Sequence, residues 1–203
     1  NILIKYFHSL LHTFFLTNYI SGICFFKKII ITPYKLILEL KNLDLLNIMI
    51  EIYTDGAASG NPGPGGYGVI LRSGAHYKEL SAGFRLTTNN RMELLAVIVG
   101  LNSLKSPGQD VTVFSDSKYV IDSVEKKWVF GWVKTGFKGK KNKDLWMQFL
   151  NIYKIHNVKF VWIKGHNNHP ENERCDVLAV AASKNKAALG IDKEFEMEKA
   201  LNN

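Results

Sequence analysis

Apolar and polar residues alternate in the central part of the chain in a way that predicts three consecutive β-strands. Residues 50–57 begin with the alternating run Ile-Glu-Ile-Tyr-Thr, and residues 66–72 and 76–84 are further short segments of strand character. The Gly- and Pro-rich residues 60–66 separate the first two segments and are typical of a turn. We therefore predict an antiparallel meander at the start of the folded domain.

Longer segments with helical character follow the meander and are interrupted by two short apolar ones. The two short segments, residues 111–115 and 158–163, predict strands. The predicted helices are residues 91–104, 117–127, 143–155 and 170–188, with an extra short helix allowed at 128–134. This order of elements is typical of a mixed sheet flanked by helices, so the expected fold class is α/β.

Four carboxylates lie at the edges of these predicted elements. They are Asp55 after the alternating run 50–54 of the first strand, Glu93 in the first turn of a helix, Asp116 after the fourth strand and Asp176 in the second turn of the last helix. Taken alone, Asp55 fits a turn residue, Glu93 a capping-box residue and Asp116 a helix N-cap. Asp176 lies too far into its helix for capping to explain it.

Glu93 has a further feature that a structural role does not explain. It shares a helical face with Val97, Gly100, Leu101 and Leu104. An isolated charge at the edge of such an apolar stripe is costly, and a bound cation would remove that cost.

Three Asp and one Glu, without a CxxC or paired-His spacing, form a ligand set for a hard divalent cation. Mg²⁺ and Mn²⁺ take oxygen ligands, and Mg²⁺ is held by few carboxylates together with water and substrate phosphate. Two such ions about 4 Å apart can activate water, stabilise charge on phosphorus and assist the departing oxygen. The pattern therefore favours metal-dependent cleavage of phosphodiester bonds.

The composition is compatible with one globular domain and a polyanionic partner. The chain has 203 residues, is 46% hydrophobic and carries a formal net charge of +8. Many ribosomal and membrane-surface proteins have a similar charge, so the charge alone does not identify the partner. Cys24 and Cys175 lie far apart, which suggests no disulfide framework and indicates a reducing, cytoplasmic setting.

Residues 1–48 differ in composition from the rest and contain no Met. Within them, residues 9–26 are uncharged and mostly apolar, which suits a marginal membrane span or signal-like segment, although several polar residues weaken that interpretation. Three interpretations stay open: an upstream region translated ahead of a start at Met49, a membrane or targeting element, and a packed extension. We predict a domain over residues 49–188 and a tail over 189–203.

Four short segments around the carboxylates point together to one family. They are YTDG at 53–56, TTNNRMEL at 87–94, FSDS at 114–117 and GHNNHPENERCD at 165–176. Together they resemble bacterial type 1 ribonuclease H, over about residues 49–188. The resemblance implies the ribonuclease H fold with a five-stranded sheet, in a metal-dependent endoribonuclease that hydrolyses the RNA strand of RNA/DNA hybrids and leaves a 5′-phosphate and a 3′-hydroxyl.

The resemblance also implies roles for individual residues. Asp55, Glu93, Asp116 and Asp176 become catalytic ligands of two Mg²⁺ ions per active site, with Mn²⁺ as an alternative. His166, in a glycine-flanked loop, becomes an aid to proton transfer or product release, although a loop histidine without a task is the alternative. The expected partner is the hybrid duplex, with no protein partner, a monomeric state, and membrane contact only if residues 9–26 are genuine.

Nucleic-acid contacts are expected from two regions. Residues 88–89 precede the Glu93 helix, where a hydroxyl, an amide and helix-start N–H groups suit a phosphate. The resemblance implies that these positions bind a phosphate of the DNA strand and contact 2′-hydroxyls of the RNA, the groups that distinguish the two strands. Residues 126–143 contain seven Lys and no acid and resemble a compact form of the family's basic protrusion, which predicts a somewhat weaker grip on substrate. The predicted binding residues are Asn61, Thr88, Asn89, Lys118, Trp128, Trp132, Lys134, Phe137 and Lys138.

Rival functions remain at this point. The chain can be a hybrid-binding module that has lost catalysis, although its complete set of four carboxylates argues against that. It can be a related nuclease or recombinase acting on DNA, because a fold does not fix a function. A membrane-tethered form rests on residues 9–26 alone.

Overall fold

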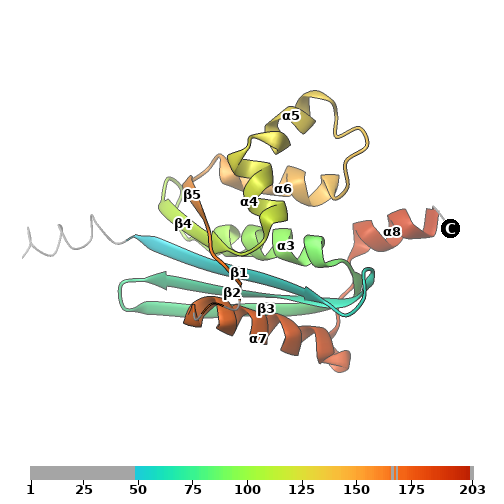
Figure 1. Ribbon diagram of the computed structural model, residues 1–203, viewed down its shortest axis with the longest axis horizontal. Coiled ribbons are helices and arrows are strands. Elements are labelled where there is room, and N and C mark those ends of the chain that lie inside the picture. Colours follow the sequence, from blue (N-terminus) through green and yellow to red (C-terminus); the bar gives the residue numbers. More distant parts are fainter. Residues whose placement is uncertain (1–48, 166, 168, 202–203) are drawn as a thin grey trace, which may run out of the picture. The chain divides into compact units, whose positions relative to one another are not determined.

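The computed structural model describes residues 49–165, 167 and 169–201, and its centre is a five-stranded mixed sheet (Figure 1). The strand order is β3-β2-β1-β4-β5, in which β1 pairs antiparallel with β2 and β2 with β3, while β4 runs parallel to both β1 and β5. The strands are β1 (Ile50–Ala58), β2 (Gly63–Ser73), β3 (His76–Thr87), β4 (Asp110–Ser115) and β5 (Asn157–Trp162).

Helices cover both faces of the sheet. Figure 1 shows α7 on one side and α3, with α4, α5 and α6 beyond it, on the other. The helices are α3 (Asn89–Asn102), α4 (Lys118–Glu125), α5 (Trp128–Lys134), α6 (Lys143–Tyr153), α7 (Pro170–Lys184) and α8 (Lys193–Leu201), with the 3₁₀ helix η1 (Lys186–Ala188) after α7.

Alternation along the central strands divides the core between these two layers. Ile52 and Val69 belong to the large cluster under α3, which also contains Trp146 and Phe149 of α6. The next residue along each strand, Tyr53 or Ile70, packs on the other face against Cys175 of α7. Successive side chains of a strand point to opposite faces, so apolar residues at consecutive positions are what a sheet covered on both sides requires.

The predicted α/β fold, the antiparallel meander and the five-stranded sheet are confirmed. The optional helix at 128–134 is present as α5. The predicted helix at 170–188 was too long, because α7 ends at Lys184 and η1 is a separate turn. Helix α8 lies in the tail after Leu189, for which no element was predicted.

Several predictions lie outside the described residues, including all those on residues 1–48, so the boundary at Met49 stays a prediction. Cys175 is buried and unbridged, and Cys24 falls in the part that is not described. Across residues 49–165, 167 and 169–201, none of the helices combines the length and apolar character needed to span a membrane.

Candidate metal centre and nucleic-acid groove

Three of the four predicted carboxylates come together at one edge of the sheet. Asp55, Glu93 and Asp116 each offer an oxygen, and these oxygens all lie within 4.8 Å of one another. The parallel pairing of β1 with β4 places Thr54 opposite Ser115. Asp55 and Asp116 therefore follow matched positions on neighbouring strands, and α3 brings Glu93 to the same place.

Asp55 lies within β1, not in a turn, and is buried with 8% of its surface exposed. The Gly56 N–H donates to Asp55 Oδ1 at 2.7 Å. The pKa of Asp55 is raised to about 7, chiefly by burial and then by the negative charge of Asp116, with a smaller contribution from Asp176, while the Gly56 N–H acts in the opposite direction. The protein itself therefore does little to stabilise the charged form of this carboxylate.

Glu93 carries the clearest sign that the site takes a cation. It is 6% exposed, and its Oε1 accepts a bond from Asn89 Nδ2 at 3.3 Å, whereas its buried Oε2 has no hydrogen-bond partner among the described residues. Burial, followed by the charges of Asp55 and Asp116, raises the pKa of Glu93 well above its usual value. A hard divalent cation would supply the missing partner and offset two of the three negative charges.

The alternative explanation of Glu93 as a capping-box residue is wrong. The N-cap of α3 is Thr88 and makes no side-chain cap hydrogen bond, so Glu93 lies at the fifth helical position, beyond the reach of a capping box.

Asp116 is positioned by its neighbours and does not cap a helix. The N-cap of α4 is Ser117, whose Oγ accepts a bond from the Val120 N–H, so the N-cap explanation of Asp116 is wrong. Trp162 Nε1 donates to the Asp116 carbonyl oxygen at 3.1 Å. A Cβ on Gly165 would lie 2.3 Å from Asp116 Oδ2, so a side chain at residue 165 would require this carboxylate to move.

Asp176 lies near the cluster without belonging to it. Among the described residues, it is not a member of the group within 4.8 Å, but its charge raises the pKa of Asp55. It is half-buried on α7, well past the first turn, where Glu171 and Glu173 suit the helix dipole. His166 is outside the described residues, so its predicted role stays a prediction.

A groove of about 660 Å³ brings together four of the predicted binding residues. Asn61 and Thr88 come from the sheet side, whereas Trp128 and Trp132 come from α5. Lys126 Nζ lies 5.1 Å from the centre of the Trp128 ring and Lys140 Nζ lies 5.3 Å from that of Trp132. Aromatic faces beside ammonium groups suit a nucleic-acid strand, which offers bases and sugars for packing and phosphates for charge pairing.

The remaining predicted binding residues lie elsewhere. Asn89 donates to Glu93, and Lys118 Nζ lies 5.4 Å above the Trp162 ring. Lys134 and Lys138 are exposed but do not line the groove. Phe137 is 4% exposed and packs against Trp132, so the structure corrects its predicted substrate contact to a core position.

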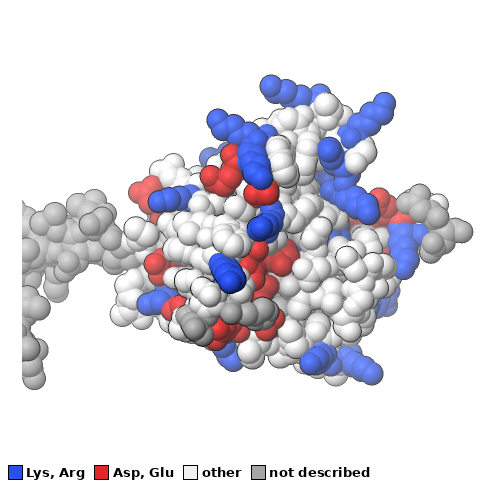
Figure 2. Space-filling view, in the orientation of Figure 1, with Lys and Arg blue, Asp and Glu red and all other residues white. Residues whose placement is uncertain are grey.

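Charge is distributed unevenly over this side of the molecule. Figure 2 shows Asp and Glu gathered near the middle of the face, with Lys and Arg around them and over the α5 region above. Such a surface suits binding of a polyanion. The polyanion can approach the acidic residues only when cations offset their negative charge.

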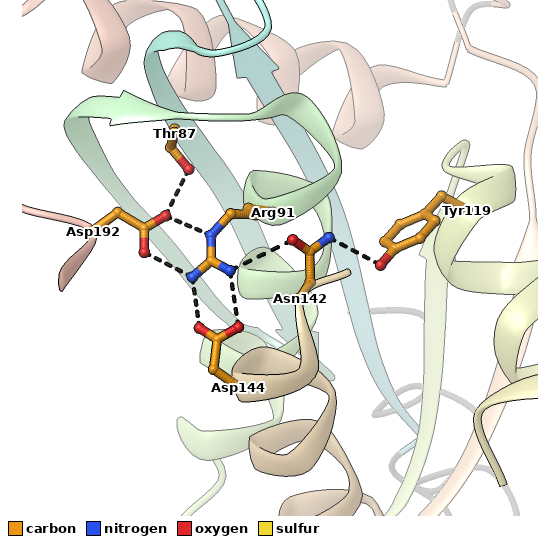
Figure 3. Close-up of polar contacts among 6 residues, drawn as sticks. All are labelled: Thr87, Arg91, Tyr119, Asn142, Asp144 and Asp192. Atoms are coloured by element: carbon orange, nitrogen blue, oxygen red, sulfur yellow. Dashed lines mark hydrogen bonds and ion pairs between the residues drawn. The ribbon is translucent and has the colours of Figure 1, made fainter. Parts of the chain in front are cut away.

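Two features near the site were not predicted from the sequence. One is Trp162, which holds the backbone of Asp116. The other is a buried ion-pair network around Arg91, which joins Asp144 and Asp192 (Figure 3). An Arg within an apolar helix signals that acidic partners are needed, but the sequence does not say which acids supply them.

Comparison with known proteins gives consistent matches. The sequence model of the RNase H family matches residues 47–184. Ribonuclease H of Desulforamulus reducens is 58% identical over 140 residues, which cover 66% of this chain and 87% of the relative. Ribonuclease H of Syntrophus aciditrophicus is 53% identical over 139 residues, covering 66% and 80%.

The fold matches as well. The crystal structure of LC9-RNase H1, described as a type 1 RNase H with the type 2 active-site motif, aligns with a TM-score of 0.61 and 29% identity over 67% of this chain and 72% of that one.

Proposed function

The chain belongs to the RNase H family, and from this we propose that it is an endoribonuclease that hydrolyses the RNA strand of RNA/DNA hybrids. The observation that carries the proposal is the cluster of Asp55, Glu93 and Asp116, with its partnerless Glu93 oxygen, inside the part of the chain that the family model matches.

The donor set fits hard divalent cations, and we assign two Mg²⁺ ions per active site, with Mn²⁺ as the alternative. Asp55, Glu93 and Asp116 would hold them, because all three offer carboxylate oxygens from buried or half-buried positions. When bound, the metal would supply Lewis acidity, which stabilises negative charge on the phosphate and eases the loss of a proton from the attacking water. The three carboxylates would position the reacting phosphate through the cations that they hold.

Asp176 and His166 take supporting roles in this proposal. Asp176 is close enough to affect Asp55 electrostatically, and a shared cation would draw the two carboxylates together. His166 comes ten residues before Asp176 in the sequence, and an imidazole in this loop can carry a proton between water and the departing oxygen. The expected products are a 5′-phosphate and a 3′-hydroxyl.

The groove gives the second strand of the duplex a place to lie. None of the four carboxylates lines it, so the strand it holds is not the strand that is cut. Thr88 lines the groove and lies on the same short segment as Asn89, which contacts Glu93. This segment therefore lies between the two strands, where the 2′-hydroxyls of RNA can be distinguished from DNA.

A panel of substrates tests the proposal. The full chain is incubated in Mg²⁺ and in EDTA with labelled RNA/DNA hybrid, duplex RNA, single-stranded RNA and duplex DNA, beside Asp55→Asn. We expect cutting of the hybrid RNA alone, dependent on Mg²⁺ and abolished by the substitution. Binding of hybrid without cutting would support a binding module instead, and cutting of duplex DNA would support a DNA nuclease.

A further inference from the structure

Helix α8, at the C-terminal end of the described chain, forms one wall of the groove. Phe195, Glu198 and Lys199 line the groove together with Trp132 and Lys140. Figure 1 shows α8 beside the start of α3, away from α7. No element was expected here from the sequence, and the family model matches only residues 47–184, so α8 lies outside the matched region.

A buried ion-pair network fixes the start of α8. The Arg91 guanidinium donates from Nε and Nη2 to the two carboxylate oxygens of Asp192, at 2.7 Å each. Thr87 Oγ1 donates to the same carboxylate at 2.7 Å. Arg91 is 1% exposed and Asp192 is 8% exposed, so the pair is shielded from water. A buried, fully bonded pair of this kind holds its two segments in one geometry.

The same guanidinium joins α8 to the opposite wall of the groove. Arg91 donates to both oxygens of Asp144 at 2.9 and 2.6 Å. The Asn142 amide donates to the Tyr119 hydroxyl at 3.0 Å, and both of these residues line the groove. Figure 3 shows these contacts as one continuous set of polar groups. The walls of the groove are therefore connected through Arg91 and are not independent.

Two further contacts orient α8 along its length. Arg85 of β3 pairs with Glu196 through Nε, at 3.1 Å to each oxygen, and through Nη2 at 2.7 Å. The Arg91 guanidinium lies 5.4 Å from the centre of the Phe195 ring. Glu196 and Phe195 thus face the body of the domain, and Lys199, one turn further along, lines the groove.

We propose that α8 is a substrate-binding element and that Lys199 contacts a phosphate of the strand held in the groove. Three lysines, Lys140, Lys141 and Lys199, line the groove, and Glu198 is the one acid among the described lining residues. The described lining residues therefore carry more positive than negative charge, and Lys199 is the cation that α8 contributes. The inference rests on the proposed function, because it requires a nucleic-acid strand in this groove.

The experiment compares two lysines on the same helix. Lys199→Gln removes a charge that lines the groove, and Lys193→Gln removes an equal charge from an exposed position that does not. Both substitutions are made in the full chain carrying Asp55→Asn, so that the hybrid stays intact. Binding of a short fluorescent RNA/DNA hybrid is then measured over a range of salt concentrations.

We expect Lys199→Gln to weaken binding several-fold at low salt and to reduce the slope of log K against log[salt] by about 0.7–0.9, which corresponds to one lost phosphate contact. Lys193→Gln should keep the parent's slope, and Lys199→Arg should retain most of the affinity. Thermal unfolding of each variant identifies any loss of binding that follows from misfolding.

The possible results distinguish a substrate-binding role of α8 from a purely structural one, and they separate failure of this inference from failure of the proposed function. Equal slopes for Lys199→Gln, Lys193→Gln and their parent would show that α8 serves stability alone and would overturn the inference while leaving the proposed function intact. A parent protein that does not bind the hybrid at all would overturn the proposed function, and this inference with it.

Discussion

Gly56 of β1 lies directly against the backbone of Glu93 in α3. A Cβ on Gly56 would come within 2.3 Å of the Glu93 backbone nitrogen and 2.6 Å of the Met92 carbonyl carbon. The missing side chain lets the helix approach the strand closely. It is this approach that brings the Glu93 carboxylate beside Asp55.

Gly56→Ala should therefore damage both the fold and the metal site. We expect the free energy of unfolding to fall by about 1–3 kcal/mol, because backbone must move to admit the methyl group. Affinity for Mn²⁺, measured by calorimetry, should fall as the carboxylates separate. Gly131→Ala is the matched control, because a Cβ there meets nothing within 4 Å. That substitution lies within α5 and should be neutral or stabilising by about 0.5–1 kcal/mol. Equal effects of the two substitutions would contradict this account.

The raised pKa of Asp55 predicts a pH-dependent stability in the absence of metal. Because its pKa is about 7 in the folded protein and about 4 in an unfolded chain, the folded state holds this proton more tightly. Its stabilising contribution is thus full below about pH 4 and is lost as the pH rises through about 7. Glu93, whose pKa is also raised, adds to the same trend.

We expect Asp55→Asn to remove much of this dependence. In EDTA at pH 8 the variant should be more stable than the natural protein by about 2–4 kcal/mol, and the difference should vanish near about pH 4. Urea unfolding at a series of pH values measures this. Stability curves that run parallel for the two proteins would show that Asp55 is not protonated in the folded state near neutral pH.

Arg91 should be a major determinant of stability. Replacing it with Met leaves Asp144 and Asp192 without their shared partner, and we expect a loss of about 3–5 kcal/mol. Lys126→Gln removes an exposed ion pair with Asp122 and should cost less than about 1 kcal/mol. Chemical denaturation of both variants makes the comparison, and similar losses would argue against a structural role for the buried network.

The position of Asp176 outside the carboxylate cluster predicts graded effects of substitution. Asp176→Asn should lower kcat but leave measurable metal binding, since Asp55, Glu93 and Asp116 are already assembled without it. Glu93→Gln should abolish both. Steady-state kinetics together with Mn²⁺ calorimetry separate the two cases. Complete loss of metal binding in Asp176→Asn would place this residue among the primary ligands.

Much of the fold could be predicted from local sequence patterns, whereas the arrangement of the site depends on contacts between residues that are far apart in the sequence. Alternating and short apolar segments located the strands, whereas the predicted edge positions hold only in part: Asp116 follows β4, but Asp55 lies inside β1 and Glu93 is the fifth residue of α3. Phe137 was misassigned because an aromatic residue in a basic segment has the same pattern whether it faces solvent or Trp132. The type of a single residue does not show whether its side chain points to solvent or into the core.

The ion pairs of Arg91 could not be predicted from the sequence either, because their partners lie far from Arg91 along the chain. Arg91 and Asp192 are separated by 101 residues, and Asp192 lies in a tail whose helix α8 has no strong apolar stripe. Electrostatic pairing across such a separation leaves no periodic signal in the sequence. Residue-by-residue transfer of a family motif also stops at residue 176, before this segment begins.

The most direct test of the central claim is cleavage of an RNA strand in an RNA/DNA hybrid by the natural chain and by Asp116→Asn, at increasing Mg²⁺, with analysis of the product ends. The account predicts cleavage that requires Mg²⁺, yields 5′-phosphate ends and disappears in the variant at every Mg²⁺ concentration. Cleavage that persists in EDTA, or that Asp116→Asn retains at the natural rate, would contradict a catalytic metal centre at Asp55, Glu93 and Asp116.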